Sequence, residues 1–151
     1  MTDLKRVLLA EDSRRDVELT LEALAENRLA NEVVVARDGA EAWDYLTRNG
    51  KYDQRPAGNP AVVLLDLKMP KMDGLDVLRS MRADANLRSV PVVVLTSSRE
   101  ERDVVESYKL GANAYVVKPV AFADFVAAVR NLGLFWAVLN QPPPGSVQRN
   151  P

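Results

Sequence analysis

Five short apolar runs, rich in valine, leucine and alanine, recur along the chain. They occupy residues 7–10, 33–36, 61–65, 92–95 and 114–117. Each run is continuous rather than alternating with polar residues, which is typical of strands that are buried on both faces of a parallel sheet. Pro60 and Pro91 directly precede two of the runs, where a missing N–H does least harm to a sheet. The runs therefore predict five parallel strands.

The segments between the runs carry apolar residues at helical spacing. Helices are predicted to begin near residues 13, 39, 74, 99 and 120, and the last runs to about residue 141. Val17, Leu21 and Leu24 form one stripe of the first helix. Gly50 is predicted to close the second helix and Gly111 the fourth. Strands that alternate with helices in this way predict an α/β sandwich with right-handed crossovers.

The composition excludes several kinds of function. The 151-residue chain has a net charge of −1 with acids and bases interspersed, which argues against a surface for nucleic acid or anionic membranes. It contains neither cysteine nor histidine, so disulfides, thiol nucleophiles, Ser-His triads and histidine metal sites are excluded. The sequence shows no signal peptide and no membrane-spanning stretch, and we expect a cytoplasmic protein.

The length fits one domain with a core of its own. We expect this domain over residues 4–141, followed by a flexible tail over residues 142–151, where three consecutive prolines precede polar residues. The loop at residues 51–59 is longer than the connection needs, and its function cannot be read from the sequence.

Polar side chains follow four of the five predicted strands. Glu11 and Asp12 follow the first strand and Asp66 the third, while Thr96 and Lys118 follow the fourth and fifth. Doubly wound sheets bind ligands outside the carboxyl ends of their strands, so these groups would converge at one edge. Taken singly, each residue is better explained as a helix cap or a surface charge. The matching set at four strand ends favours a site.

Three carboxylates at one edge would repel one another and raise one another's pKa values unless a cation neutralises them. Oxygen ligands that leave positions for water and phosphate suit Mg²⁺. With the metal and Lys118 balancing the charge, Asp66 can attack a phosphoryl group, and Thr96 can donate a hydrogen bond to a phosphoryl oxygen. The set predicts Mg²⁺-assisted phosphoryl transfer to Asp66.

These residues lie in motifs that resemble the receiver domain of bacterial response regulators. The motifs are Glu11-Asp12, the run Asp66-Leu-Lys-Met-Pro-Lys-Met-Asp-Gly74, Leu95-Thr96-Ser97 and Val117-Lys118-Pro119. The resemblance covers roughly residues 4–132. It implies a flavodoxin-like (βα)5 doubly wound sandwich with a five-stranded parallel sheet of order 2-1-3-4-5. It also implies a single-domain switch, with only self-phosphorylation and autodephosphorylation chemistry, rather than an enzyme.

The resemblance implies a role for each site residue. Asp66 would be the phosphoacceptor. Asp12, Asp66 and the backbone carbonyl of Lys68 would bind Mg²⁺ directly, and Glu11 would act mainly through a metal-bound water. Lys118 would pair with the phosphoryl group.

The resemblance also implies a mechanism of switching. Thr96 would swing toward the phosphoryl oxygens and let Tyr115 move inward, which would reshape the surface of the last two helices and the last strand. Lys68 and Ser98 occupy positions that tune the lifetime of the aspartyl phosphate in the family. The peptide bond before Pro119 would be cis. Because the chain has no histidine, its phosphoryl group would come from a sensor histidine kinase.

Three other functions compete with this interpretation. Phosphatases with an aspartyl nucleophile on a similar fold resemble Asp-x-Asp at the strand end, but the second position here is Lys68, a poorer acid/base at neutral pH. A non-phosphorylated interaction module is opposed by the intact acidic pair together with Asp66, Thr96 and Lys118. A flavin- or dinucleotide-binding protein is disfavoured, because no glycine-rich phosphate loop follows any predicted strand.

The C-terminal segment carries large apolar residues at spacings of three and four. Leu134, Phe135 and Trp136 would pass the edge of the sheet, and exposed apolar patches usually mark a protein interface. We therefore expect a homodimer through the C-terminal helix, with Phe135 and Trp136 in its interface. This ending and the 51–59 loop resemble the small stand-alone response regulators that partner cyanobacterial and bacterial phytochromes, which implies a bacterial phytochrome as the sensor kinase.

Overall fold

The structure, a computed structural model, describes residues 6–26, 32–118, 121, 123–124, 127 and 131. Within these residues the strands of one sheet are β1 (Arg6–Ala10), β2 (Glu32–Ala36), β3 (Val62–Leu65), β4 (Val92–Thr96) and β5 (Ala114–Val117). The sheet has the order β2-β1-β3-β4-β5, and every neighbouring pair is parallel. The predicted order 2-1-3-4-5 is confirmed, and each predicted run matches its strand to within one residue at either end.

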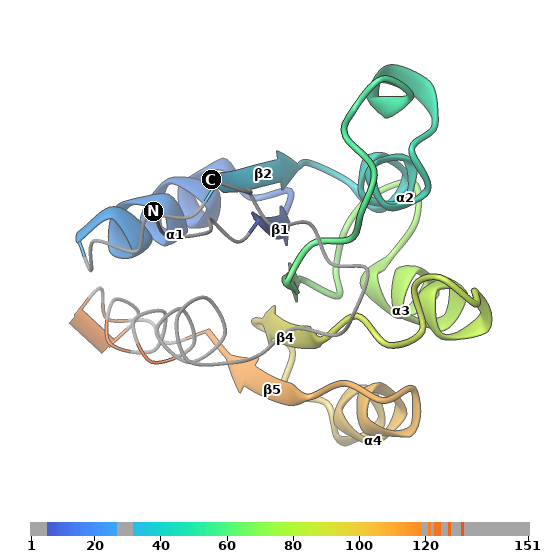
Figure 1. Cartoon of the computed structure of the whole chain (residues 1–151). Coiled ribbons are helices and arrows are strands. Elements are labelled where there is room, and N and C mark those ends of the chain that lie inside the picture. Colours follow the sequence, from blue (N-terminus) through green and yellow to red (C-terminus); the bar gives the residue numbers. More distant parts are fainter. Residues whose placement is uncertain are drawn as a thin grey trace.

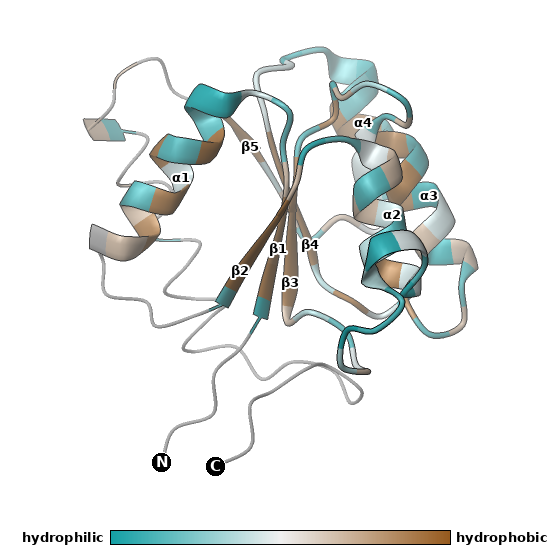
Figure 2. Ribbon diagram, turned by 90° about the horizontal axis from the view of Figure 1, so that it is seen from above, coloured by the Kyte–Doolittle hydropathy of each residue, from teal (hydrophilic) through white to brown (hydrophobic). Residues whose placement is uncertain are grey.

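The described helices are α1 (Arg14–Glu26), α2 (Gly39–Thr47), α3 (Gly74–Ala83) and α4 (Glu101–Lys109), with a short 3₁₀ helix over Gly50–Tyr52. Helix α1 covers one face of the sheet, and α2, α3 and α4 lie on the other face (Figure 1, Figure 2). None of the helices within the described residues has the length and apolar character of a membrane span. Most of the predicted fifth helix lies outside the described residues, although Ala123, Asp124, Ala127 and Asn131 are helical. The domain bounds at 4 and 141, the tail and the peptide bond before Pro119 also lie outside them.

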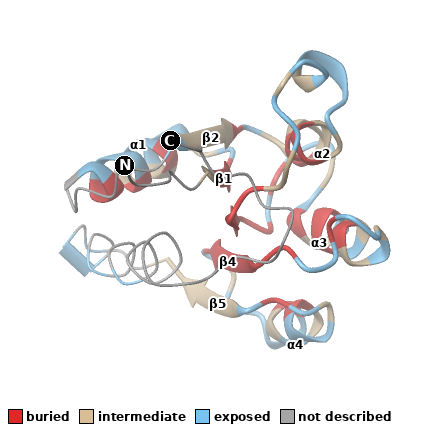
Figure 3. Cartoon of the chain, in the orientation of Figure 1, coloured by how far each residue is buried: buried red, intermediate tan, exposed pale blue. Residues whose placement is uncertain are grey.

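The core is divided between the two faces of the sheet by the alternation of side chains along each strand. On β1, Leu8 packs in a larger apolar cluster with Val77 and Leu78 of α3. The next residue, Leu9, packs in a smaller cluster with Val17 of α1. The central strands β3 and β4 are fully buried, whereas the edge strands β2 and β5 are largely half-buried (Figure 3).

Two local predictions are wrong. Helix α2 ends at Thr47, and Arg48 rather than Gly50 takes the left-handed conformation that closes it, with φ of 59° and an N–H that bonds to carbonyls of the last turn. Gly50 instead begins the 3₁₀ helix. Leu21, predicted in the apolar stripe of α1, is 36% exposed. The neighbouring Thr20 is buried in its place, because its hydroxyl donates to a carbonyl of the preceding turn.

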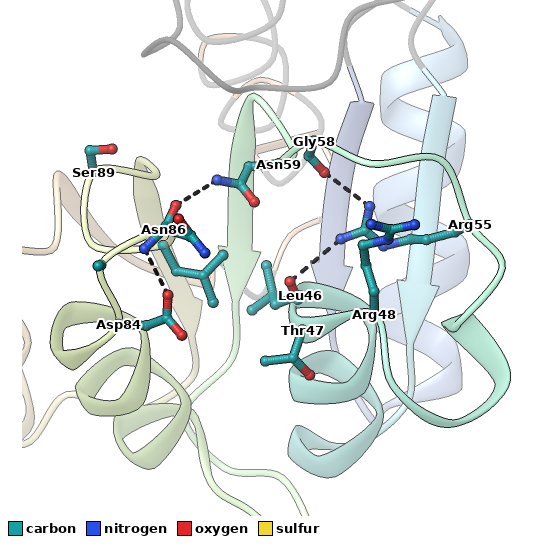
Figure 4. Close-up of a pocket in the computed structure, with 11 residues that line it drawn as sticks. Leu46, Thr47, Arg48, Arg55, Gly58, Asn59, Asp84, Asn86 and Ser89 are labelled. Atoms are coloured by element: carbon teal, nitrogen blue, oxygen red, sulfur yellow. Dashed lines mark hydrogen bonds between the residues drawn. The ribbon is translucent and has the colours of Figure 1, made fainter.

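The long loop before β3 is held by Arg55. Its guanidinium donates to the carbonyls of Tyr45 at 2.7 Å and Gly58 at 2.9 Å, and it lies 4.3 Å from the centre of the Tyr45 ring. Asn59 donates to the carbonyl of Asn86 at 2.7 Å, beside a cavity of about 550 Å³ (Figure 4). This cavity adjoins the beginnings of β3 and β4, so it lies at the opposite edge of the sheet from the predicted site.

Candidate functional site

The carboxyl ends of the strands deliver the predicted site residues to one edge, because main-chain bonds continue past the strands. The N–H of Glu11 donates to the last carbonyl of β2 at 2.9 Å, that of Asp66 to the last carbonyl of β1 at 3.0 Å, and that of Lys118 to the last carbonyl of β4 at 2.8 Å. Glu11, Asp66 and Thr96 are buried. The sheet itself therefore sets the backbone of these residues.

Three carboxylates meet as predicted. Glu11, Asp12 and Asp66 each place one carboxylate oxygen within 4.8 Å of the others, and Asp12 is the exposed member of the group. All three donors are oxygens and one faces solvent, which suits a hard divalent cation that keeps some of its water. The N–H of Lys68 donates to Asp66 Oδ1 at 3.3 Å, so Lys68 lies beside the group, and its carbonyl as a ligand stays a prediction.

The ammonium of Lys118 lies among three acids. Its Nζ donates to Glu11 Oε1, to Asp16 Oδ2 at 2.7 Å and to Asp66 Oδ2 at 3.3 Å. The side chain is only 8% exposed. Burial alone would lower the pKa of Lys118, but the hydrogen bonds to Asp16 and Glu11 and the charge of Asp66 outweigh burial and raise it. Lys118 is therefore a charged group throughout the physiological pH range.

The acidity of Glu11 is strongly perturbed. Burial and the neighbouring Asp66 raise the pKa of Glu11 to about 8, although Lys118 opposes the shift. Glu11 Oε2 also accepts from the N–H of Ser13 at 3.1 Å. One ammonium thus leaves the pocket short of positive charge, and a bound divalent cation would supply it.

The loop from Asp66 to α3 depends on a close approach at Gly74. A Cβ at this position would lie 2.2 Å from the main-chain oxygen of Asp66. The N–H of Gly74 donates to the carbonyl of Leu67 at 2.9 Å, and Asp73 caps the helix by accepting from the N–H of Asp76 at 2.9 Å. Glycine, which has no Cβ, lets α3 begin this close to Asp66.

Thr96 and Tyr115 meet at the loop after β4. Thr96 Oγ1 accepts from the N–H of Ser98 at 3.3 Å, and the Tyr115 hydroxyl donates to the Ser98 carbonyl at 3.0 Å. The Ser98 hydroxyl donates to Asp103 at 2.5 Å, and Lys68 Nζ lies 3.5 Å from the same carboxylate oxygen. The two predicted switch residues therefore contact one residue of this loop, and both positions expected to tune lifetime contact Asp103.

Two acids at the site, Asp16 and Asp103, were absent from the prediction. Both lie in the first turn of a helix, where an acid is ordinarily explained by the helix dipole. Asp12 lies just before α1 and Asp16 in its first turn, four residues later, and this spacing was a usable signal. For Asp103 the sequence offered no comparable signal. The predicted interface residues Phe135 and Trp136 lie outside the described residues.

Comparison with known proteins identifies relatives over most of the chain. Residues 7–130 match the response regulator receiver domain family. The chain is 39% identical over 132 residues to response regulator Rcp1 of Synechocystis sp., which covers 87% of this chain and 88% of Rcp1. The crystal structure of the Mn²⁺-bound form of Rcp1 matches with a TM-score of 0.86 and 37% identity, covering 92% of this chain and 99% of that one.

Two further structures are those of phytochrome response regulators. The phosphorylated cyanobacterial phytochrome response regulator RcpA matches with a TM-score of 0.87 and 38% identity, over 93% of this chain and 99% of that one. The bacteriophytochrome response regulator RtBRR is 64% identical, with a TM-score of 0.76, over 95% of this chain and 86% of that one. The chain therefore belongs to the response regulator receiver domain family, whose members are signalling switches of two-component systems rather than conventional enzymes.

Proposed function

We propose that this response regulator accepts one phosphoryl group on Asp66, with Mg²⁺ in the acidic pocket, and signals through the conformational change that follows. The observation that carries the proposal is the 3.3 Å contact between Lys118 Nζ and Asp66 Oδ2 beside two further carboxylates. Phosphoryl transfer asks a protein mainly to place charges around the transferred group. A buried carboxylate with an ammonium and an oxygen-rich cation site beside it meets that need.

The metal residues are those of the carboxylate group. Asp12, Asp66 and the Lys68 carbonyl would hold Mg²⁺ directly, and Glu11 would act through water. The cation would neutralise the pocket and the phosphoryl oxygens. The charges around the pocket support this role, because Glu11, Asp16 and Asp66 all contact the single ammonium of Lys118. The Mn²⁺-bound form of Rcp1 supports a divalent cation in this family.

Transfer begins with an oxygen of ionised Asp66 attacking the phosphorus. The new O–P bond forms as the N–P bond of a phosphohistidine on the donor breaks, and the histidine nitrogen keeps the electron pair. Lys118 turns from Asp66 to a phosphoryl oxygen. Autodephosphorylation is the attack of water on the same phosphorus, which returns Asp66 to its carboxylate.

The switch starts at Thr96. Thr96 Oγ1 accepts from the N–H of Ser98, so a movement of the Thr96 hydroxyl toward a phosphoryl oxygen would pull on this contact. Because the Tyr115 hydroxyl bonds to the carbonyl of the same Ser98, a movement of this loop reaches Tyr115 on β5. The charge added at Asp66 would thereby shift the position of the loop after β4 and of helix α4, which follows it.

A phosphohistidine donor must lie on another protein, because the chain contains no histidine. We assign this role to a sensor histidine kinase of the phytochrome class, since RcpA and RtBRR are phytochrome response regulators by name. Phosphotransfer profiling tests the assignment. A phosphorylated bacterial phytochrome kinase should transfer to this chain faster than unrelated kinases do, and equal rates for all kinases would overturn it.

A small phosphodonor tests the phosphorylation site. With Mg²⁺ and acetyl phosphate, the full chain should gain one acid-stable, alkali-labile phosphoryl group, detected by intact-protein mass spectrometry. Asp66→Asn should abolish the gain. Asp76→Asn is the matched control, because Asp76 lies on the first turn of α3 with its side chain 53% exposed. Labelling that survives Asp66→Asn would overturn the assignment.

The homodimer is a proposal that rests on the sequence alone. Phe135 and Trp136 lie in an apolar stripe of the C-terminal segment, and large exposed apolar groups usually mark an interface. Trp136→Glu should therefore lower the mass measured by light scattering in solution. A wild-type protein that is already monomeric would reject the dimer.

A further inference from the structure

The pocket contains one acid that the proposed function does not use. We propose that Asp16 is a positioning residue, which holds the ammonium of Lys118 at the rim of the pocket so that Lys118 and a divalent cation can occupy the pocket together. The inference rests on the proposed function, because it assumes a cation among the carboxylates of Glu11, Asp12 and Asp66.

Asp16 is fixed at the start of α1. Its N–H donates to the Ser13 hydroxyl at 3.3 Å, and its carbonyl accepts from the Thr20 hydroxyl at 2.7 Å. From this position Asp16 Oδ2 reaches Lys118 Nζ at 2.7 Å, whereas Asp66 Oδ2 lies at 3.3 Å from the same nitrogen. Asp16 is thus a close partner of the ammonium, held by an element that begins only two residues after Asp12.

The three acceptors around Lys118 differ in what else they must do. An ammonium has three N–H donors, and the three acids use all of them. Glu11 and Asp66 also belong to the carboxylate group that would hold the cation, but Asp16 does not. Its side chain is 25% exposed, against 3% for Glu11 and 7% for Asp66, so its charge is partly solvated.

Glu11 and Asp66 would turn toward a bound cation, and the ammonium of Lys118 would be repelled by it. Asp16 is then the partner that Lys118 keeps. Without Asp16, the remaining acceptors of Lys118 would both be carboxylates that the cation needs. The ammonium would compete with the cation, and the affinity for Mg²⁺ would fall.

Asp16→Asn should raise the dissociation constant of Mg²⁺ about tenfold, because the hydrogen bond to Lys118 loses the negative charge that strengthens it. Isothermal titration calorimetry with MgCl₂ on the full chain measures this constant without any phosphorylation step. Glu18→Gln is the matched control, since Glu18 lies on the same helix, pairs with Arg14 at 3.3 Å and is 67% exposed. The control should change the constant less than twofold, as a screened surface charge does.

A Lys118→Met background separates positioning from a simple loss of negative charge. If Asp16 acts by holding Lys118, Asp16→Asn should have little effect on Mg²⁺ affinity once Lys118 is absent. If Asp16 acts on the cation through space, the effect should be the same in both backgrounds, and that result overturns the inference. Asp16→Glu, which keeps the charge, should recover most of the affinity and so guards against a folding defect.

Failure of the inference can be told from failure of the proposed function. A wild-type chain that binds Mg²⁺ and is phosphorylated on Asp66, with an Asp16→Asn variant of unchanged Mg²⁺ affinity, overturns only the role of Asp16. A wild-type chain that binds no Mg²⁺ at millimolar concentration overturns both the metal site and the inference built on it.

Discussion

Arg82, near the end of α3, donates to four main-chain carbonyls at the edge of the sheet opposite the proposed phosphorylation site. Its Nη1 donates to the carbonyls of Arg88 and Val90, its Nε to that of Leu110 and its Nη2 to that of Gly111, each at 2.9 Å. One side chain thereby joins α3 to the connections before β4 and β5. The change Arg82→Met keeps a long apolar stem and removes every donor.

The loss of stability expected for Arg82→Met depends on how deeply these hydrogen bonds are buried. Those to Val90 and Leu110 are partly buried, whereas the other two are exposed and water can replace them. A hydrogen bond that involves a charged group contributes about 1.5 kcal/mol. Arg82→Met should therefore lower the free energy of unfolding by about 2–3 kcal/mol. That loss corresponds to a fall in Tm of about 4–12 °C for a protein of this size.

Urea unfolding followed by circular dichroism measures the loss, with Arg79→Met as the matched control. Arg79 lies one turn earlier on α3, is 53% exposed and forms ion pairs with Asp76 and Glu106. Such surface pairs contribute little, so the control should lose less than about 1 kcal/mol. Equal stability of the two variants would refute the idea that Arg82 clamps the opposite edge of the sheet.

Three further predictions concern the site. Gly74→Ala should destabilise the protein by about 1–3 kcal/mol and slow phosphorylation, because the new Cβ would meet the main-chain oxygen of Asp66 at 2.2 Å; urea unfolding and acetyl phosphate labelling check both effects. Chelation of Mg²⁺ should lower the Tm of the wild type, because an ion that binds only the folded state stabilises that state. The Tm of Asp12→Asn, which lacks a proposed metal ligand, should stay nearly unchanged. Asp103→Ala should speed amide hydrogen exchange at Ser98, because the hydroxyl of Ser98 loses its 2.5 Å partner; unchanged exchange would mean that Asp103 does not hold this loop.

The strands of the sheet could be predicted from the sequence because the central ones are buried. Strands β3 and β4 are buried along their whole length, and a strand covered on both faces is apolar at nearly every position. The parallel arrangement then brings all strand ends to one edge, which is why Asp66, Thr96 and Lys118 could be placed together from the sequence. The end of α2 was less predictable, because Arg48 takes a backbone conformation that glycine usually adopts.

The partners of the site residues were harder to predict than the residues themselves. Asp16 and Lys118 are 102 positions apart, and their contact depends on how α1 packs beside the end of β5. Asp103 lies five residues beyond Ser98, and it reaches Ser98 because the first turn of α4 buries its side chain. Such contacts follow from the packing of helices against the sheet, and a single sequence does not encode that packing in any local pattern.

Direct mapping of the phosphorylated residue decides whether Asp66 is the phosphoacceptor. Reduction of the phosphorylated chain with borohydride converts an aspartyl phosphate to homoserine, and peptide mass spectrometry then locates the converted residue. We predict homoserine at position 66 alone, formed only when Mg²⁺ and the phosphodonor are both present. Conversion at Asp12 or at any other acid, or none at position 66 in a phosphorylated chain, would contradict the mechanism.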